Sequence, residues 1–449
     1  MKLYLESLGC ARNQVDSEIM IGRLKKVGWT IADDPKDADT IVVNTCSFIE
    51  TAAEESIDTI LELAEYKKEG SCNRLIVTGC LPERYREDIV TSLPEVDVFL
   101  GTGAFDQIVN AVQEPRFSSL CLLPDPDLIA AQDNGSPREL SMPHMAYLKI
   151  AEGCSKACTY CIIPKLRGKQ KSRSPEDIVS EARELISLGV KELVLVAQDT
   201  TAYGKDLPES VNLSLLMKRL ATLKGDDPDA NVESWFRVLY GHPESIETSF
   251  IKTIASHSNV CKYFDIPIQH VSTDVLKRMG RRYSRDDLCR LFDRIRTHVP
   301  DAVLRTTIIV GFPGETDRDF KELLQFAEET RFDHLGVFIY SDAEDLSSHR
   351  LDNHVPPAIA RDRYHQLMST QSGISSENNQ KYIGKTVKVL VEESLNNYLF
   401  AGRTNFQAPE VDGISYVNTA KLPFDLKIGC FVDMRVTDAM EYDLMGEVV

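Results

Sequence analysis

The sequence lacks any apolar run near the roughly 18–20 residues that a membrane-spanning helix requires. Its first residues, MKLYLESLGC, also lack the long apolar core and the small-residue cleavage site of a signal peptide. We therefore expect a cytoplasmic protein, in which thiols stay reduced. The eleven cysteines are then better explained by metal binding or catalysis than by disulfides.

The chain is also short of positive charge. It has 51 Lys and Arg residues against 69 Asp and Glu residues, a formal net charge of −18. Nucleic-acid binding draws much of its affinity from Lys and Arg at phosphates, so this balance argues against DNA or RNA as the main partner. It favours a basic partner, although many acidic proteins are simply soluble.

At 449 residues the chain is too long for one typical core, and its patterns divide it into four stretches. Residues 1–114 alternate strand and helix patterns, which predicts a parallel α/β domain. Residues 115–142 are rich in Pro, Asp and Ser and predict a linker. Residues 143–380 predict a second domain of βα units, and residues 381–449 a small all-β module.

The second domain contains six strand candidates with helical segments between them. They are Met145–Ala151, Glu192–Ala197, Trp235–Tyr240, Tyr263–Ile268, Val303–Val310 and Leu335–Tyr340. Six βα units predict a partial (βα)6 barrel, two units short of a full one, with its site at the carboxyl ends of the strands. A last helical stretch, Ala358–Gln380, leads into the final module.

The final module has short strand patterns separated by turns and predicts a five-stranded barrel that recognises a substrate. From Lys381 onwards it carries seven basic and ten acidic residues. A surface that grips RNA would usually be basic.

Three cysteines of the first domain each follow a predicted strand. Cys10 ends KLYLESLGC, Cys46 ends DTIVVNTC and Cys80 ends NRLIVTGC. The carboxyl ends of parallel strands meet at one edge of a sheet, so we expect the three thiols to converge there. Three unrelated buried thiols are the alternative.

A second group, Cys154, Cys158 and Cys161, follows the first strand of the predicted barrel as C-x3-C-x2-C. Structural zinc requires four ligands, so a zinc site would need His144 or His242 as well. Three thiolates without a nearby fourth suit a 4Fe–4S cluster that leaves one iron open.

With Tyr160 before its last cysteine and a partial barrel around it, this motif resembles the radical S-adenosylmethionine (SAM) superfamily. The resemblance implies that the open iron binds the amino and carboxyl groups of SAM. An electron from the cluster then cleaves the sulfonium, and the resulting 5′-deoxyadenosyl radical takes hydrogen from an unactivated carbon. No catalytic residue is predicted beyond the cluster ligands.

With Cys10, Cys46 and Cys80 upstream and a TRAM-like β module downstream, nearly the whole chain resembles the methylthiotransferases. In that family the N-terminal cysteines hold a second 4Fe–4S cluster, which carries the inserted sulfur. SAM serves as both methyl donor and radical source, and an electron donor is a further implied partner.

Two branches of that family are candidates. The stretches SLGCARNQVDSE, AQDTTAYG, YFDIPIQH and YDLMGE are most similar to the branch that modifies an aspartate of ribosomal protein S-twelve. Ala11-Arg12 stands where that branch usually has Pro-Lys. In this branch –SCH3 replaces a hydrogen on the aspartate β-carbon of a very basic protein. The other branch modifies adenosines beside the tRNA anticodon.

Further cofactor contacts are predicted at Tyr160, Gln198, Asp199 and Arg305. Gln198 and Asp199 close the second barrel strand, where ordinary helix capping would explain them equally well. The guanidinium of Arg305 suits the cofactor carboxylate, or the side chain is simply exposed on an alternating strand.

Two more interpretations complete the analysis. The basic run KLRGKQKSRS beside the second cysteine group is expected to be a solvated surface, or else to offset acidic groups of substrate or cofactor. A non-catalytic zinc or iron–sulfur protein that docks a partner through its β module is the alternative from another functional class.

Overall fold

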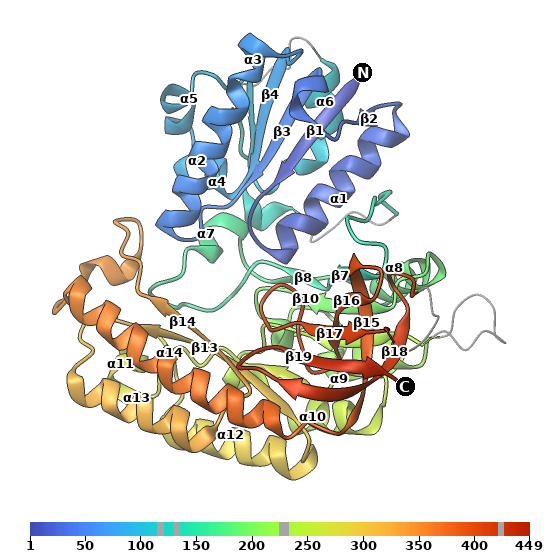
Figure 1. Cartoon of the computed structure of the whole chain (residues 1–449). Helices are drawn as coiled ribbons and strands as arrows, with labels where there is room; N and C mark the ends of the chain where they lie inside the picture. The colour runs from blue at the N-terminus through green and yellow to red at the C-terminus, as the bar shows by residue number, and fades with distance from the viewer. Residues whose placement is uncertain (115–120, 130–134, 224–232, 421–425) are drawn as a thin grey trace.

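The structure is a computed structural model that describes residues 1–114, 121–129, 135–223, 233–420 and 426–449. An N-terminal α/β domain stands on a central domain, and a C-terminal β-barrel packs against the central domain (Figure 1). Among the residues described, no helix is long and apolar enough to cross a membrane.

The N-terminal domain is a parallel six-stranded sheet with the order β2-β1-β3-β4-β5-β6. Its strands are β1 (Lys2–Ser7), β2 (Thr30–Ile31), β3 (Thr40–Thr45), β4 (Arg74–Gly79), β5 (Val98–Leu100) and β6 (Cys121–Leu122). Its helices are α1 (Ala11–Lys26), η1 (Pro35–Asp37), α2 (Glu50–Ala64), α3 (Tyr66–Glu69), α4 (Cys80–Tyr85), α5 (Asp88–Ser92), η2 (Phe105–Gln107) and α6 (Ile108–Gln113). The predicted parallel α/β domain is confirmed.

The stretch predicted as a linker is partly structured. It contributes β6 to the sheet, followed by η3 (Pro126–Leu128). Residues 115–120 and 130–134 of the predicted linker lie outside the described residues.

The central domain is a partial barrel of parallel strands, as predicted. Strands β7, β10 and β11 form one half and β12, β13 and β14 the other, and a parallel bridge between Phe236 and Val260 connects them. The barrel strands are β7 (Met145–Lys149), β10 (Glu192–Val196), β11 (Trp235–Val238), β12 (Tyr263–Asp265), β13 (Val303–Val310) and β14 (His334–Ile339). A short antiparallel pair, β8 (Ala151–Glu152) and β9 (Lys171–Ser172), flanks the loop that carries the second cysteine group.

Helices alternate with these strands. They are α7 (Ile163–Arg167), α8 (Pro175–Ser187), η4 (Thr200–Ala202), α9 (Leu213–Ala221), η5 (Pro243–Ser245), α10 (Thr248–Ser256), α11 (Thr273–Arg278), α12 (Arg285–His298), α13 (Asp317–Thr330), η6 (Ser347–Arg350) and α14 (Pro357–Gln380). Local sequence explains their starts: Ser174 caps α8 by accepting from the backbone N of Asp177, and Ser284 and Thr316 form capping boxes.

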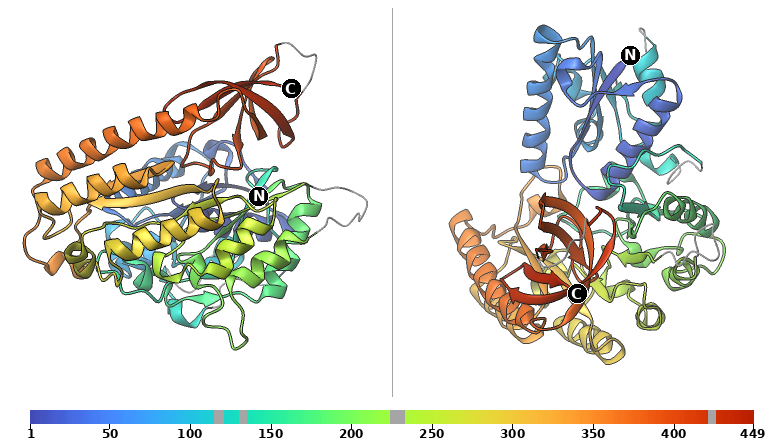
Figure 2. Two further views of the ribbon diagram at one scale, coloured as in Figure 1. Left: turned by 90° about the horizontal axis from the view of Figure 1, so that it is seen from below. Right: turned by 45° about the vertical axis from the view of Figure 1, so that its right-hand side comes forward.

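The C-terminal module is a closed five-stranded barrel with the order β15-β16-β17-β19-β18, as predicted. Its strands are β15 (Thr386–Asn396), β16 (Leu399–Thr404), β17 (Ser415–Asn418), β18 (Phe431–Ala439) and β19 (Leu444–Val448). Helix α14 runs along the central domain and delivers the chain to this barrel, as the left view of Figure 2 shows.

Candidate functional site

The three N-terminal cysteines lie at one edge of the sheet because β1, β3 and β4 are neighbours in it. Cys10 is the N-cap of α1, Cys46 directly follows β3, and Cys80 is the first residue of α4. A Cβ placed on Gly9 would lie 2.8 Å from Cys46 Cβ, so the first two loops are in contact. Cys10 and Cys46 also lie close enough to Cys80 for their charges to act on it, so the three thiols converge as the strand pattern predicts.

Asn13, on the first turn of α1, ties these loops together. Its Nδ2 donates to the carbonyls of Leu8 (3.0 Å) and Thr45 (2.8 Å), which lie just before Cys10 and Cys46. The side chain is buried, so these bonds form away from water. Sequence reasoning missed this residue, although its position three residues after a predicted ligand was a usable signal.

The electrostatics of these three thiols differ. Burial would raise the pKa of Cys10, but the guanidinium groups of Arg12 and Arg167 bring it below its ordinary value. Burial raises the pKa of Cys46, and it raises that of Cys80 to about 12 against the opposing charge of Arg167. Cys10 is therefore the thiol most readily ionised, and the other two need a metal to hold them as thiolates.

The second cysteine group lies on the loop between β8 and α7, at the carboxyl end of the first barrel strand. The loop is held by backbone bonds from Cys154 N to Gly168 O (3.0 Å) and from Thr159 N to Met279 O (3.1 Å). Burial raises the pKa of Cys161 to about 12, and negative charge on Cys158 and Cys154 contributes to this increase. The three sulfurs are thus electrostatic neighbours.

Each cysteine group offers three thiols, a donor set that a 4Fe–4S cluster with one open iron can use. In the described part of the chain, no group of three or more His, Cys, Asp and Glu side chains is arranged to hold one metal ion. The thiolates of a cluster each bind a different iron atom, so they are spaced more widely than the ligands of one zinc ion.

Two of the predicted cofactor residues present buried acceptors without partners. Gln198 donates from Nε2 to Glu152 Oε1 (2.6 Å), and its Oε1 has no hydrogen-bond partner. Asp199 accepts from Thr201 and the backbone of Ala202 through Oδ1, whereas its buried Oδ2 has none. Asp199 lies close enough to Cys154 for its charge to act on that thiol, so an amino group bound beside Cys154 would satisfy it.

The other two predicted cofactor residues are engaged within the chain. The hydroxyl of Tyr160 accepts from Arg281 Nε (3.1 Å), and its ring packs edge-on against Phe312. Arg305 Nη1 donates to Asp265 Oδ1 (2.8 Å), and its Nε lies 3.6 Å from Asp412 Oδ1. The charge of Arg305 is therefore already matched by two carboxylates.

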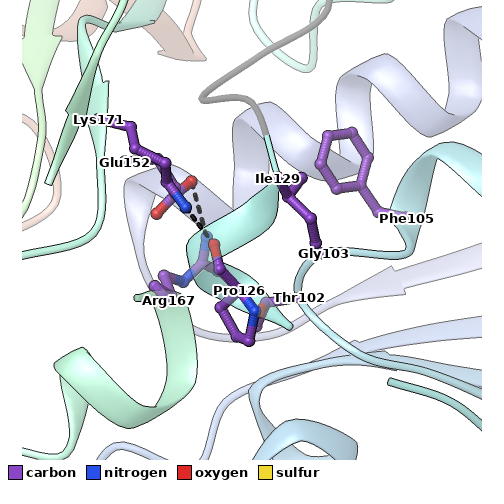
Figure 3. A pocket seen from close by; sticks show the side chains of 8 residues that line it. All are labelled: Thr102, Gly103, Phe105, Pro126, Ile129, Glu152, Arg167 and Lys171. Carbon is purple, nitrogen blue, oxygen red and sulfur yellow. Dashed lines mark hydrogen bonds and ion pairs between the residues drawn. The ribbon is translucent and has the colours of Figure 1, made fainter. Parts of the chain in front are cut away.

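The basic run 165–174 is not the solvated surface that was expected. Arg167 and Arg173 are buried, and only part of the run, such as Lys165 and Lys169, is exposed. The expectation was wrong because these guanidinium groups pair with buried carboxylates, which a charge pattern alone does not reveal. Arg167 meets Glu152 beside a small pocket at the boundary between the N-terminal and central domains (Figure 3).

Family comparisons match all three domains. Residues 2–101 match the uncharacterized protein family UPF0004, residues 148–327 the radical SAM superfamily, and residues 383–449 the TRAM domain. Fold and domain matches together define a radical SAM protein with an additional α/β domain and a TRAM barrel.

Relatives that match over the full length of the chain identify the family within the radical SAM proteins. The ribosomal protein uS12 methylthiotransferase RimO of Desulfosudis oleivorans is 53% identical over 448 residues, which cover 100% of both chains. The protein of the same name from Clostridioides difficile is 49% identical over 451 residues, covering 100% of this chain and 99% of that one. The chain belongs to the RimO family.

Solved structures share the fold at low sequence identity. The radical SAM methyltransferase TsrM from Kitasatospora setae, with cobalamin and a [4Fe-4S] cluster bound, has a TM-score of 0.58 at 12% identity, covering 86% of this chain and 96% of that one. The cobalamin-dependent SAM radical enzyme OxsB has a TM-score of 0.52 at 12% identity, covering 83% of this chain and 56% of that one.

Proposed function

We propose that the protein is a radical SAM methylthiotransferase that adds a methylthio group to the β-carbon of an aspartate in ribosomal protein uS12. This proposal rests mainly on the positions of the two three-cysteine groups in a member of the RimO family. Both groups lie at carboxyl ends of parallel strands, on either side of one domain boundary. A donor of sulfur and a generator of radicals need this proximity.

The six cysteines would hold two 4Fe–4S clusters, one on Cys10, Cys46 and Cys80 and one on Cys154, Cys158 and Cys161. When bound, the clusters and SAM supply one-electron chemistry, a methyl group and the sulfur. Reduction requires an electron donor as partner. The chain's own contribution is to bury Cys80, to hold the loops of Cys10 and Cys46 through Asn13, and to keep a guanidinium beside Cys10.

Asp199 and Gln198 are the proposed cofactor acceptors, because each keeps a buried oxygen without a partner. Tyr160 would contribute its ring, since its hydroxyl is held by Arg281. Arg305 would instead anchor the C-terminal domain to the central domain. It forms an ion pair with Asp265 on β12 of the central barrel, and it approaches Asp412 of the C-terminal domain.

The net charge of the chain agrees with a ribosomal protein as the substrate. A net charge of −18 favours encounter with a basic ribosomal protein, and the acidic C-terminal barrel is a poor surface for tRNA. We propose that residues 1–114 carry the sulfur-donating site, residues 143–380 the radical site after a linker at 115–142, and residues 381–449 the contact with the ribosomal protein. Such an enzyme would act in the cytoplasm.

The test is anaerobic turnover of the full chain, reconstituted with iron and sulfide, with methyl-labelled SAM and a strong reductant. Ribosomal protein uS12 and tRNA are offered in the same reaction. We expect label in uS12, with a mass increase at one aspartate that corresponds to –SCH3 in place of hydrogen. A variant in which Cys154, Cys158 and Cys161 are alanine should transfer none.

Two results would contradict the proposal. Label that enters only tRNA would move the protein to the other methylthiotransferase branch. Reconstituted protein that never cleaves SAM would favour a binding protein without catalysis.

A further inference from the structure

Arg167 occupies an unusual place between the two cysteine groups. It is the last residue of α7, which begins two residues after Cys161, and only 3% of it is exposed. Helix α7 packs against α4, the helix that starts at Cys80. In Figure 1, α7 lies at the boundary between the N-terminal and central domains.

On the N-terminal side, one nitrogen of Arg167 contacts Asn13 and Cys80 of the first cysteine group. Its Nη2 donates to Asn13 Oδ1 and lies 3.9 Å from Cys80 Sγ. Because Asn13 also holds the loops that carry Cys10 and Cys46, this single guanidinium nitrogen connects all three thiol-bearing loops.

On the central side, the other nitrogen reaches Glu152, which precedes the second cysteine group in the chain. Arg167 Nη1 lies 3.0 Å from Glu152 Oε2, two residues before Cys154. Glu152 Oε1 in turn accepts from Gln198, the neighbour of Asp199. The planar guanidinium group of Arg167 thus connects the proposed sulfur-donating site to the proposed cofactor site.

Arg167 and the charged groups that are linked to it by ion pairs form a balanced set. Arg167 and Lys149 contribute two positive charges, and Asp16 and Glu152 contribute two negative charges, with ion pairs of 2.6 to 3.2 Å among them. Removal of the Arg167 charge leaves an excess of negative charge next to Cys80. Lysine in its place keeps the positive charge but lacks the two planar N–H donor groups of the guanidinium.

We propose that Arg167 is a positioning residue that fixes the two cysteine groups relative to each other and keeps a positive charge beside the N-terminal one. The inference rests on the proposed function. A nearby positive charge stabilises the reduced form of a cluster, because reduction adds negative charge. Fixed geometry matters because sulfur must meet the substrate carbon from which hydrogen was removed.

The test compares Arg167→Gln, Arg167→Lys and a matched control, Arg173→Gln. Arg173 belongs to the same run and is also buried, but it donates to Lys149 O and Glu181, away from the thiols. The first readout is the midpoint potential of the N-terminal cluster, measured without substrate in a chain whose Cys154, Cys158 and Cys161 are alanine. The second is the ratio of methylthiolated uS12 to 5′-deoxyadenosine in the full chain.

We expect Arg167→Gln to move the midpoint potential to more negative values and to lower the product ratio by about tenfold, the usual scale for residues that orient metal ligands. Arg167→Lys should keep the potential and still lower the ratio. Arg173→Gln should change neither quantity.

An unchanged potential and ratio in Arg167→Gln would overturn the inference, and so would full recovery of the ratio in Arg167→Lys. If Arg167→Gln does not retain iron, Arg167→Lys still tests whether the planar guanidinium of Arg167 is needed for product formation. A wild-type chain that does not modify uS12 would defeat the proposed function alone, since the potential is measured without substrate.

Discussion

Arg237 Nε lies 2.7 Å from Glu192 Oε1, and neither side chain has any exposed surface. Arg403 of the C-terminal barrel lies 2.6 Å from the other oxygen of the same carboxylate. Arg237 also donates to the carbonyls of Thr404 and Asn405. This buried network fastens the last domain to the barrel strands β10 and β11.

Replacing Arg237 by Met should therefore weaken both the fold and the docking of the last domain. The change leaves the fully buried Glu192 with one charged partner, and breaking a buried pair costs about 3–5 kcal/mol. Denaturant unfolding of the variant measures the loss. Lys388→Met, which breaks the exposed pair with Glu233, is the control and should cost less than about 1 kcal/mol. Equal losses in the two variants would contradict this assignment.

The same domain junction should be sensitive to acid through Glu392. Burial would raise the pKa of this carboxyl, but His144 and Arg403, at 3.3 and 2.6 Å, bring it down to about 2. A group with a lowered folded-state pKa contributes stability above its ordinary pKa of 4.5, and this contribution is lost as pH falls toward 2.

Unfolding of wild type and Glu392→Gln across this pH range measures that contribution. The wild type should be more stable at pH 5, and the difference should shrink steadily on acidification. Glu393→Gln, at the exposed neighbouring position, should behave as the wild type does. A difference that grows as the pH falls would have the wrong sign for this mechanism.

Much of the architecture could be predicted because it depends on local sequence patterns. The three cysteines after β1, β3 and β4 converge because parallel strands end at one edge, a property of topology alone. The six barrel strands and the closed C-terminal barrel follow from apolar runs and turn residues. The start of α1 at Ala11 could not be read from the sequence, because its N-cap residue, Cys10, makes no side-chain capping hydrogen bond.

What could not be predicted are the partners of buried charges. Arg167 lies in a run that was expected to be a solvated surface, yet it pairs with Glu152 of its own domain and with Asp16 across the domain boundary. Arg305 fitted a cofactor carboxylate on chemistry alone, yet Asp412, more than a hundred residues later, occupies part of its surroundings. Such pairings are set by tertiary contacts that no local spacing encodes.

Gly79, the last residue of β4, should be required for the N-terminal cysteine site. Its φ is +98°, and a Cβ there would lie 2.5 Å from Asn44 Oδ1 and 2.6 Å from the Thr45 carbonyl, just before Cys46. Gly79→Ala should therefore displace the strand end that carries Cys46 and reduce iron per chain by up to about half.

Gly28→Ala is the matched control for that substitution. Gly28 has a similar φ of +91° with nothing within 4 Å of the added Cβ, so alanine there carries only the backbone strain of about 1 kcal/mol. Iron analysis and unfolding of both variants separate the two effects. Equal iron content in the two variants would show that crowding at Gly79 does not affect the site.

Iron stoichiometry tests the division into two independent sites. The reconstituted wild type should hold about eight irons per chain, and replacement of Cys10, Cys46 and Cys80 by alanine should leave about four. That variant should still cleave SAM but release no methylthiolated uS12, because the radical site is intact and the sulfur-donating site is lost. Replacement of Cys72, Cys261 and Cys289, thiols outside both groups, should leave all the iron in place. If the first triple variant lost all of its iron or none, the two groups could not be separate cluster sites.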